Sequence, residues 1–214
     1  RDHMKNTIYV CSNPYSEKIL SKSQFAKLDE VWRYAWDEDV GTIRPRPVTD
    51  RAIMAGRERD EERMIIHYMQ PHYPFVAGNA AEVFDSNDRL HIDKFDSAGA
   101  GSVWDRLKEG EVTEDAVWDG YAANLRGVLE DLQLLLKNVE SDNVVITSDH
   151  GNSLGEWGIY GHPVHIPLNS LQKVPWIRTE GTDIGEYTPE SYQQEIGGGA
   201  NVKQRLSDLG YVDE

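Results

Sequence analysis

The sequence predicts an α/β domain with a mainly parallel sheet flanked by helices. Short β-branched runs alternate with stretches of helix-like apolar spacing, and the 214 residues are enough for one domain with a sizeable core. Strands that alternate with helices are typical of parallel sheets, because each parallel strand needs a crossover connection. We therefore expect residues 5–214 to form a single domain. Residues 1–4 (Arg-Asp-His-Met) are typical of a vector-derived remnant.

The first half of the chain is expected to hold two strands, up to three helices and a long irregular segment. In order, these are a strand over 6–12, one or two helices within 16–40, a proline-rich connection over 41–47, a helix over 49–59, a strand over 64–69 and an irregular, glycine-containing segment over 71–101. Thr49 is the expected N-cap of its helix, with Asp50 in the first turn.

The helix after Thr113 is the clearest local prediction in the second half. Thr113 is a typical N-cap, and Glu114 and Asp115 favour the positive end of the helix dipole. Apolar residues then recur at steps of three and four and should face the sheet: Trp118, Tyr121, Leu125, Val128, Leu132 and Leu135. The other expected elements are a buried strand over 144–147, an edge strand over 174–177 and a terminal helix over 201–209.

Composition excludes several classes of function. There are 37 acidic and 22 basic residues, and the net charge is −15. This balance argues against nucleic-acid binding and against docking on anionic lipid, since both need a basic surface. No apolar run approaches the roughly 18 residues of a membrane span, so we expect a cytoplasmic protein. The single cysteine excludes an internal disulfide.

The acidic composition has two interpretations. Only nine of the 22 basic residues are lysine, and the acidic residues are scattered along the chain. A dispersed, lysine-poor, acidic surface is typical of salt-adapted proteins, such as those of halophilic archaea. An ordinary acidic protein is the equally weighted alternative, and the sequence does not indicate the oligomeric state.

Candidate metal ligands follow two of the expected strands. Asp149 and His150 come directly after the strand over 144–147, and His72 follows the strand over 64–69. If both strands run in the same sense in one parallel sheet, their carboxyl ends open onto one edge and the loops converge. A carboxylate and an imidazole suit a divalent cation, and calcium, manganese and zinc all remain open. The alternative is that Asp149 and His150 only cap a loop.

The segment from Ser148 to His162 resembles the metal-site motif of the sulfatase family of the alkaline phosphatase superfamily. The family pattern runs roughly S-D-H-G-x-x-L-G-E-x-G, followed by Lys or His, and residues 148–158 match it, with His162 four residues on. Three other segments resemble family features in the same order: residues 67–75 (the PHxPY motif), 117–125 (the helix before the metal strand) and 205–211 (a frequent chain ending). The resemblance covers residues 63–214.

This resemblance implies an alkaline phosphatase-like fold and a metal-dependent hydrolase of sulfate or phosphate esters. It implies that Asp149 and His150 bind a divalent metal ion, which would polarise a sulfuryl or phosphoryl oxygen. His72, by its place in the PHxPY motif, would contact the transferred anion. His162 stands where many sulfatases have an anion-binding Lys, and this departure leaves sulfate and phosphate both open. The implied substrates are small-molecule or glycan esters.

The resemblance fails at the nucleophile. Sulfatases convert a Cys or Ser in a C/S-x-P-x-R context, whereas Cys11 has its proline three places on and no Arg after it. Cys11 is therefore expected to be a small core residue. The favoured interpretation is a part of a longer enzyme, inactive alone, whose other part supplies the nucleophile and the remaining metal ligands. The alternatives are a non-catalytic relative that binds an anion or a partner, and a phospho-group transferase.

Other polar residues have weaker claims to a role. His165 lies close to His162 but outside the motif, His67 is expected to be a packed histidine, and His91 has no motif around it. Glu156 is expected to hold the glycine turn through backbone hydrogen bonds. The glycines of this turn fit neither a P-loop nor a dinucleotide fingerprint, so a nucleotide-binding Rossmann protein is not indicated.

Overall fold

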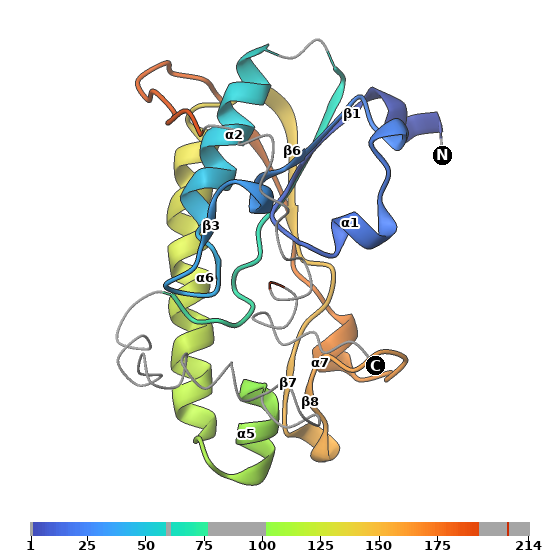
Figure 1. The fold of residues 1–214 in the computed structure, drawn as a ribbon, viewed down its shortest axis with the longest axis vertical. Helices are drawn as coiled ribbons and strands as arrows, with labels where there is room; N and C mark the ends of the chain where they lie inside the picture. Colours follow the sequence, from blue (N-terminus) through green and yellow to red (C-terminus); the bar gives the residue numbers. More distant parts are fainter. Residues whose placement is uncertain (1, 59–60, 77–101, 193–204, 206–214) are drawn as a thin grey trace.

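The computed structural model describes residues 2–58, 61–76, 102–192 and 205 (Figure 1). The strands are β1 (Thr7–Cys11), β2 (Lys27–Glu30), β3 (Trp36–Asp37), β4 (Thr42–Ile43), β5 (Arg63–His67), β6 (Ser141–Thr147), β7 (Ser153–Leu154), β8 (Tyr160–Gly161) and β9 (Trp176–Gly181). The α-helices are α1 (Ser16–Ile19), α2 (Pro45–Glu58), α5 (Val103–Glu109), α6 (Glu114–Leu136) and α7 (Asn169–Gln172). The predicted terminal helix over 201–209 lies outside the described residues, apart from Arg205.

The architecture is mixed α/β, as predicted, but less of the sheet is parallel than expected. A parallel three-stranded sheet has the order β2-β1-β5, and β6 pairs with β9 in a separate antiparallel ribbon. The expectation that the strands before His72 and Asp149 share one parallel sheet is therefore wrong for the described part of the chain. The chain returns from β6 to β9 without a long crossover helix, and such a return permits an antiparallel pair.

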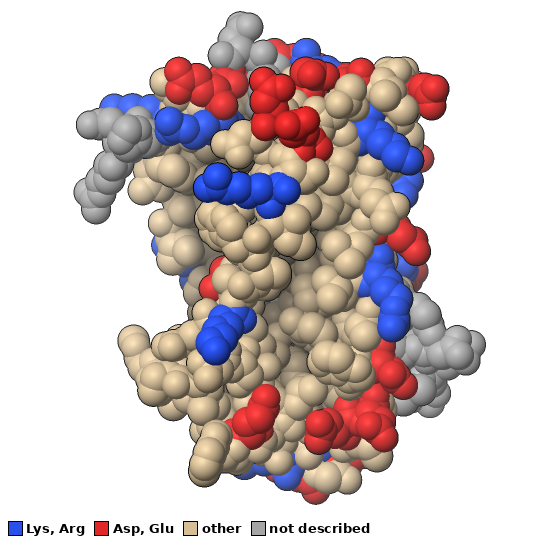
Figure 2. All heavy atoms as spheres, turned by 180° about the vertical axis from the view of Figure 1, so that it is seen from behind, with Lys and Arg blue, Asp and Glu red and all other residues tan. Residues whose placement is uncertain are grey.

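The main core lies between the parallel sheet and the helices α2 and α6, which pack against each other (Figure 1). Val10 on β1 and Ile53 on α2 are fully buried there. Strand alternation sends Ile66 to this core and Ile65 to the opposite face, where Ile65 is 38% exposed. The space-filling view from behind shows mostly uncharged side chains at the centre and acidic side chains at both ends (Figure 2).

The predicted helices within residues 16–40 are largely wrong. This segment contains the short α1 and then β2, which pairs in parallel with β1. Buried polar contacts hold β2 in place: Arg51 of α2 forms an ion pair with Asp29 at 2.7 Å, and Ser16 donates to Glu30 at 2.6 Å. Contacts with residues far along the chain thus override the local helix-like spacing.

Helix α2 begins at Pro45, earlier than predicted. Proline is tolerated in the first turn of a helix, because the N–H groups there have no intrahelical acceptor. Thr49 is consequently an interior residue rather than the N-cap. Its hydroxyl lies 3.3 Å from the Pro45 carbonyl and 2.9 Å from the Tyr68 hydroxyl.

Helix α6 begins as predicted, but its buried face is rotated from the predicted one. Thr113 Oγ1 accepts a hydrogen bond from Ala116 N at 3.2 Å, which confirms the N-cap. Trp118 and Leu125 of the expected face are 56% and 40% exposed. The residues that α6 buries are Val117, Gly120, Asn124, Val128, Asp131 and Leu135. Helix α5 was not predicted; its N-cap is Ser102, whose side chain accepts from Asp105 N.

Gly120 allows a close contact between α6 and the loop after β5. A Cβ atom at this position would lie 2.3 Å from the buried Phe75 ring. Replacing glycine by alanine in a helix normally stabilises by roughly 1 kcal/mol. Here we expect Gly120→Ala to lower the free energy of unfolding by about 1–3 kcal/mol, because the ring must move in a packed core. Urea denaturation measures the change, with the exposed Asp119→Ala as control; a stabilised Gly120→Ala variant would contradict the packing.

Candidate functional site

The loop after β5 carries His72 and is held in position by the side chain of Asn124 on helix α6. Asn124 is 1% exposed. Its Nδ2 donates to the carbonyls of His72 and Pro74, each at 3.0 Å, and its Oδ1 accepts from Val76 N at 2.8 Å. One buried amide therefore satisfies three backbone groups of this loop, and it sets the position of His72 relative to the helix.

The loop after β6 carries Asp149 and His150. Asp149 Oδ1 accepts from His150 N at 2.9 Å, and the Asp149 side chain is 70% exposed. His150 Nδ1 lies 2.9 Å from the Gly151 carbonyl, which only accepts, so Nδ1 carries the proton. His150 Nε2 is thereby left with its lone pair, 3.7 Å from Asp149 Oδ2. Both side chains present electron pairs, as metal ligands do.

Gly151 brings α7 close behind this loop. Gly151 N donates to the Leu171 carbonyl at 2.9 Å, and a Cβ atom on Gly151 would lie 2.0 Å from the Ser170 carbonyl oxygen. No other residue type fits this approach without movement of the backbone. The glycine at this place in the motif therefore has a packing role.

Residues 153–161 form a tight turn that leads to His162. Glu156 Oε2 accepts from Ser153 Oγ at 2.6 Å and from Leu154 N at 2.7 Å, as predicted for a residue that holds the turn. These hydrogen bonds, that from Ser153 above all, lower the pKa of Glu156. Gly161 has a φ of +68°, and a Cβ there would lie 3.0 Å from the Trp104 ring. The turn thus directs His162 back toward the β5 loop.

The loop after β5, the loop after β6 and the turn that ends at His162 bring three imidazoles together. His72 Nε2 lies 3.2 Å from His162 Nε2, and the ring centroids of His150 and His162 are 4.4 Å apart. The convergence occurs even though β5 and β6 do not share a sheet. His72 Nδ1 donates to the Tyr73 carbonyl, so the proton in the His72–His162 contact belongs to His162 Nε2.

Burial keeps the imidazoles of His72 and His162 uncharged at neutral pH. It lowers the pKa of His72 to about 4, and the neighbouring His162 and His150 act in the same direction against the Tyr73 hydrogen bond. Burial also lowers the pKa of His162, with His150 the next cause. Neutral imidazoles are the form that binds metal ions and relays protons.

The described residues alone do not complete a metal site. Within residues 2–58, 61–76, 102–192 and 205, no group of three or more His, Cys, Asp or Glu side chains is arranged to hold a metal ion. Asp149 and His150 fit a divalent cation by donor type and by the tautomer of His150. They are two ligands, and structural zinc sites use four.

Three other candidates from the sequence are His165, His91 and Cys11. His165 is exposed, with a positive φ of 64°, and His91 is outside the described residues. Cys11 is buried and free, and burial raises the pKa of its thiol, so it suits the core role predicted for it. Asn124 was missed as a site residue; a polar side chain on the buried face of an otherwise apolar helix is the signal that could have identified it.

Comparisons with known proteins identify no family for this chain. No protein-family model matches it, and neither a curated protein nor a solved structure has significant similarity to it. None of the helices in the described part of the chain has the length and apolar character of a membrane span.

Proposed function

We propose that this chain contributes the metal- and anion-binding half of a sulfatase-like hydrolase that cleaves sulfate or phosphate esters. In this proposal the fold is alkaline phosphatase-like, Asp149 and His150 hold a divalent metal ion, and His72 and His162 contact the transferred group. The nucleophile and the remaining ligands are not among the described residues. The observation that supports the proposal most is the 3.2 Å approach of His72 and His162 beside the Asp149-His150 loop.

The side chains in the proposed site have two roles, metal binding and hydrogen bonding to the transferred group. Asp149 and His150 present oxygen and nitrogen lone pairs, which suit calcium, manganese or zinc. A bound ion would supply Lewis-acid polarisation of a sulfuryl or phosphoryl oxygen. At neutral pH the His72–His162 pair holds one proton between its facing Nε2 atoms, and an oxyanion bound against the pair would compete with His72 for the N–H of His162.

A non-catalytic anion- or partner-binding domain is the second candidate. The absence of a third ligand among the described residues favours it, since two ligands hold a metal ion weakly. The two candidates differ in one property, because only the hydrolase needs a metal ion at Asp149. Phospho-group transfer to an alcohol would use the same side chains and is distinguished only by its acceptor.

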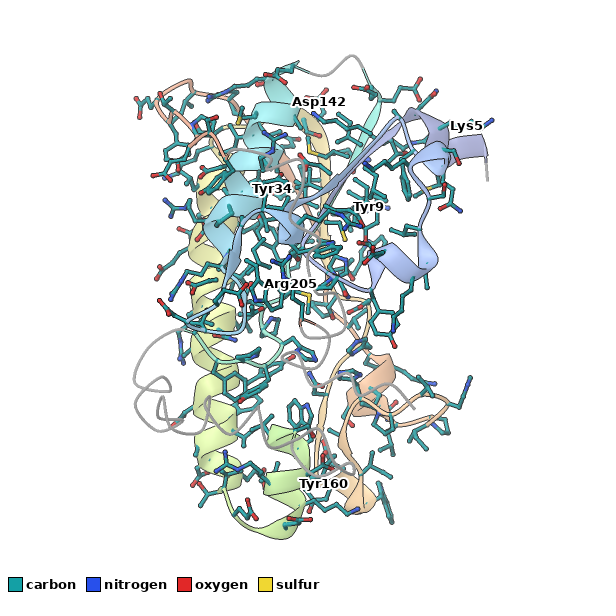
Figure 3. All side chains as sticks on the ribbon, viewed as in Figure 1. Lys5, Tyr9, Tyr34, Asp142, Tyr160 and Arg205 are labelled. Carbon is teal, nitrogen blue, oxygen red and sulfur yellow. The ribbon has the colours of Figure 1, made fainter. Side chains whose placement is uncertain are left out.

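Metal binding by the purified chain tests the proposal. We expect calorimetric titration with zinc or manganese to show one site that Asp149→Ala weakens by at least about tenfold, because a ligand is lost. Asp142→Ala, at the opposite end of β6 (Figure 3), is the matched control and should bind as the unaltered chain does. Equal affinity in all three proteins, or no binding by any of them, would favour the non-catalytic alternative.

A further inference from the structure

Strands β5 and β6 run side by side in the same direction. Gly56 of α2 lies beside the start of both: a Cβ atom there would be 2.8 Å from Val139, two residues before β6, and 3.4 Å from the Met64 side chain of β5. The loops that follow the two strands meet at the three imidazoles described above. Strands of similar length that share a neighbour at the start and meet after the end lie alongside each other.

The two strands nevertheless do not pair with each other. Within the part of the chain that the structure describes, β5 pairs only with β1, and β6 pairs only with β9. Because β1 already has a strand on each side, β6 lies beyond the open edge of β5. Met64 and Val139 reach from the two strands to within 3.4 Å of one point above Gly56. This reach corresponds to roughly two strand spacings, about 10 Å, and one further strand fits in such a space.

The burial of β5 and β6 is that of sheet edges, although their sequences are those of inner strands. In β1, which has a neighbour on each side, four of the five residues are buried, whereas β5 and β6 have no buried residue. Yet β6 contains Val144, Val145 and Ile146 in succession, as is typical of a strand buried on both faces. Ile65 of β5 and Val145 of β6 are each 38% exposed. A strand between β5 and β6 would cover these apolar side chains.

The sequence argues against two sources of such a strand. Residues 77–101 and 193–214, which lie outside the described residues apart from Arg205, contain no two consecutive β-branched residues, so they lack the pattern of an inner strand. A second copy of this chain would bring another net charge of −15, and the repulsion between the copies opposes their association. The strand is therefore expected from a different polypeptide segment.

We propose that the space between β5 and β6 binds one further β-strand, which runs parallel to both and belongs to the part of the enzyme that carries the nucleophile. This inference rests on the proposed function for the owner of the strand. A parallel strand ends where β5 and β6 end, so the residues that follow it lie beside His72 and Asp149. Addition of one strand through its backbone hydrogen bonds thus completes the sheet and the site together.

Cysteine pairs test whether the space exists in the isolated chain. In the control pair, Val145→Cys with Arg178→Cys, the residues are direct partners in the β6–β9 ribbon, and we expect oxidation to join them. In the test pair, Ile65→Cys with Val145→Cys, we expect no disulfide, since its Cα atoms must lie within about 7 Å. A bifunctional maleimide that spans about two strand spacings, roughly 10 Å, should join the test pair instead. A disulfide in the test pair, or no reaction with the maleimide, would overturn the inference.

Amide hydrogen exchange with a synthetic strand tests the docking. The probe is a peptide as long as β6, 7 residues, of alternating valine and isoleucine with a lysine added at each end. Its matched control has proline at the centre, which cannot donate to a neighbouring strand. We expect the probe to slow exchange in both β5 and β6 by at least about tenfold, and the proline peptide to slow it in neither. Protection of fewer than both strands would overturn the inference.

Zinc titration of the same chain separates this inference from the proposed function. Zinc binding that Asp149→Ala weakens, without protection of β5 and β6 by the probe, would overturn the strand site and leave the metal site standing. Protection of both strands in a chain that binds no zinc would support the strand site and contradict the proposed hydrolase.

Discussion

Replacing Asn124 with alanine is expected to lower the free energy of unfolding by about 3 kcal/mol and to release His72 from its position. The substitution removes three hydrogen bonds of a buried amide and leaves the carbonyls of His72 and Pro74 and the N–H of Val76 without this partner. Buried hydrogen bonds contribute about 1 kcal/mol each, and unsatisfied groups cost more. Urea denaturation measures the stability, and the imidazole proton shifts of His72 report on its position.

Asn138→Ala is the matched control for this prediction. Asn138 is also buried, and its side chain binds the Leu134 carbonyl, the Arg57 guanidinium and Tyr187 N near the other end of α6. We expect a comparable loss of stability but unchanged His72 signals. If both variants leave the His72 signals in place, Asn124 does not position the β5 loop.

The free energy of unfolding is expected to decrease as the pH is lowered, because His72 takes up a proton. The pKa of His72 is about 4 in the folded chain, against about 6.5 when unfolded, so the unfolded state takes up the proton first. Stability from the neutral imidazole is therefore fully present above about pH 6.5 and is lost as the pH falls toward 4. At about 1.4 kcal/mol per pKa unit, the loss is about 3 kcal/mol.

His72→Gln isolates this contribution from that of the carboxylates. Both proteins lose stability in acid, but we expect the unaltered chain to lose about 3 kcal/mol more than the variant between pH 7 and pH 4. Urea denaturation at several pH values measures the difference. Parallel pH profiles would mean that His72 is not held neutral by its surroundings.

The sequence predicted the helices and strands that depend on interactions between residues close together in the chain. The N-cap Thr113 and the acidic first turn identified the start of α6, and the β-branched run before Ser148 identified a strand within β6. The prediction that this strand is buried was wrong, because no residue of β6 is buried and Val145 is 38% exposed. Residues 27–30 were mistaken for helix, because Asp29 and Glu30 are held in β2 by partners from α2 and α1. The sequence shows the spacing of side chains but not which distant partner will satisfy a buried charge.

The sequence indicated which side chains would come together, but it did not indicate which contacts position them. The motif around Asp149 and His150 and the separate His72 indicated convergence, and the structure brings His72, His150 and His162 together. The convergence was expected from two strands of one parallel sheet, and this was wrong, since β5 and β6 belong to different sheets. Asn124 and the tight glycine contacts, which fix the loops, depend on packing that periodicity does not reveal.

The most direct test of this account is the distance between the His72 and His162 rings in solution. With Nε2 atoms 3.2 Å apart, the carbon-bound ring protons lie close enough for a nuclear Overhauser effect in the selectively labelled chain. We expect that signal in the unaltered chain and its loss in Asn124→Ala. A folded, unaltered chain without any contact between these two rings would contradict the convergence on which the proposed function depends.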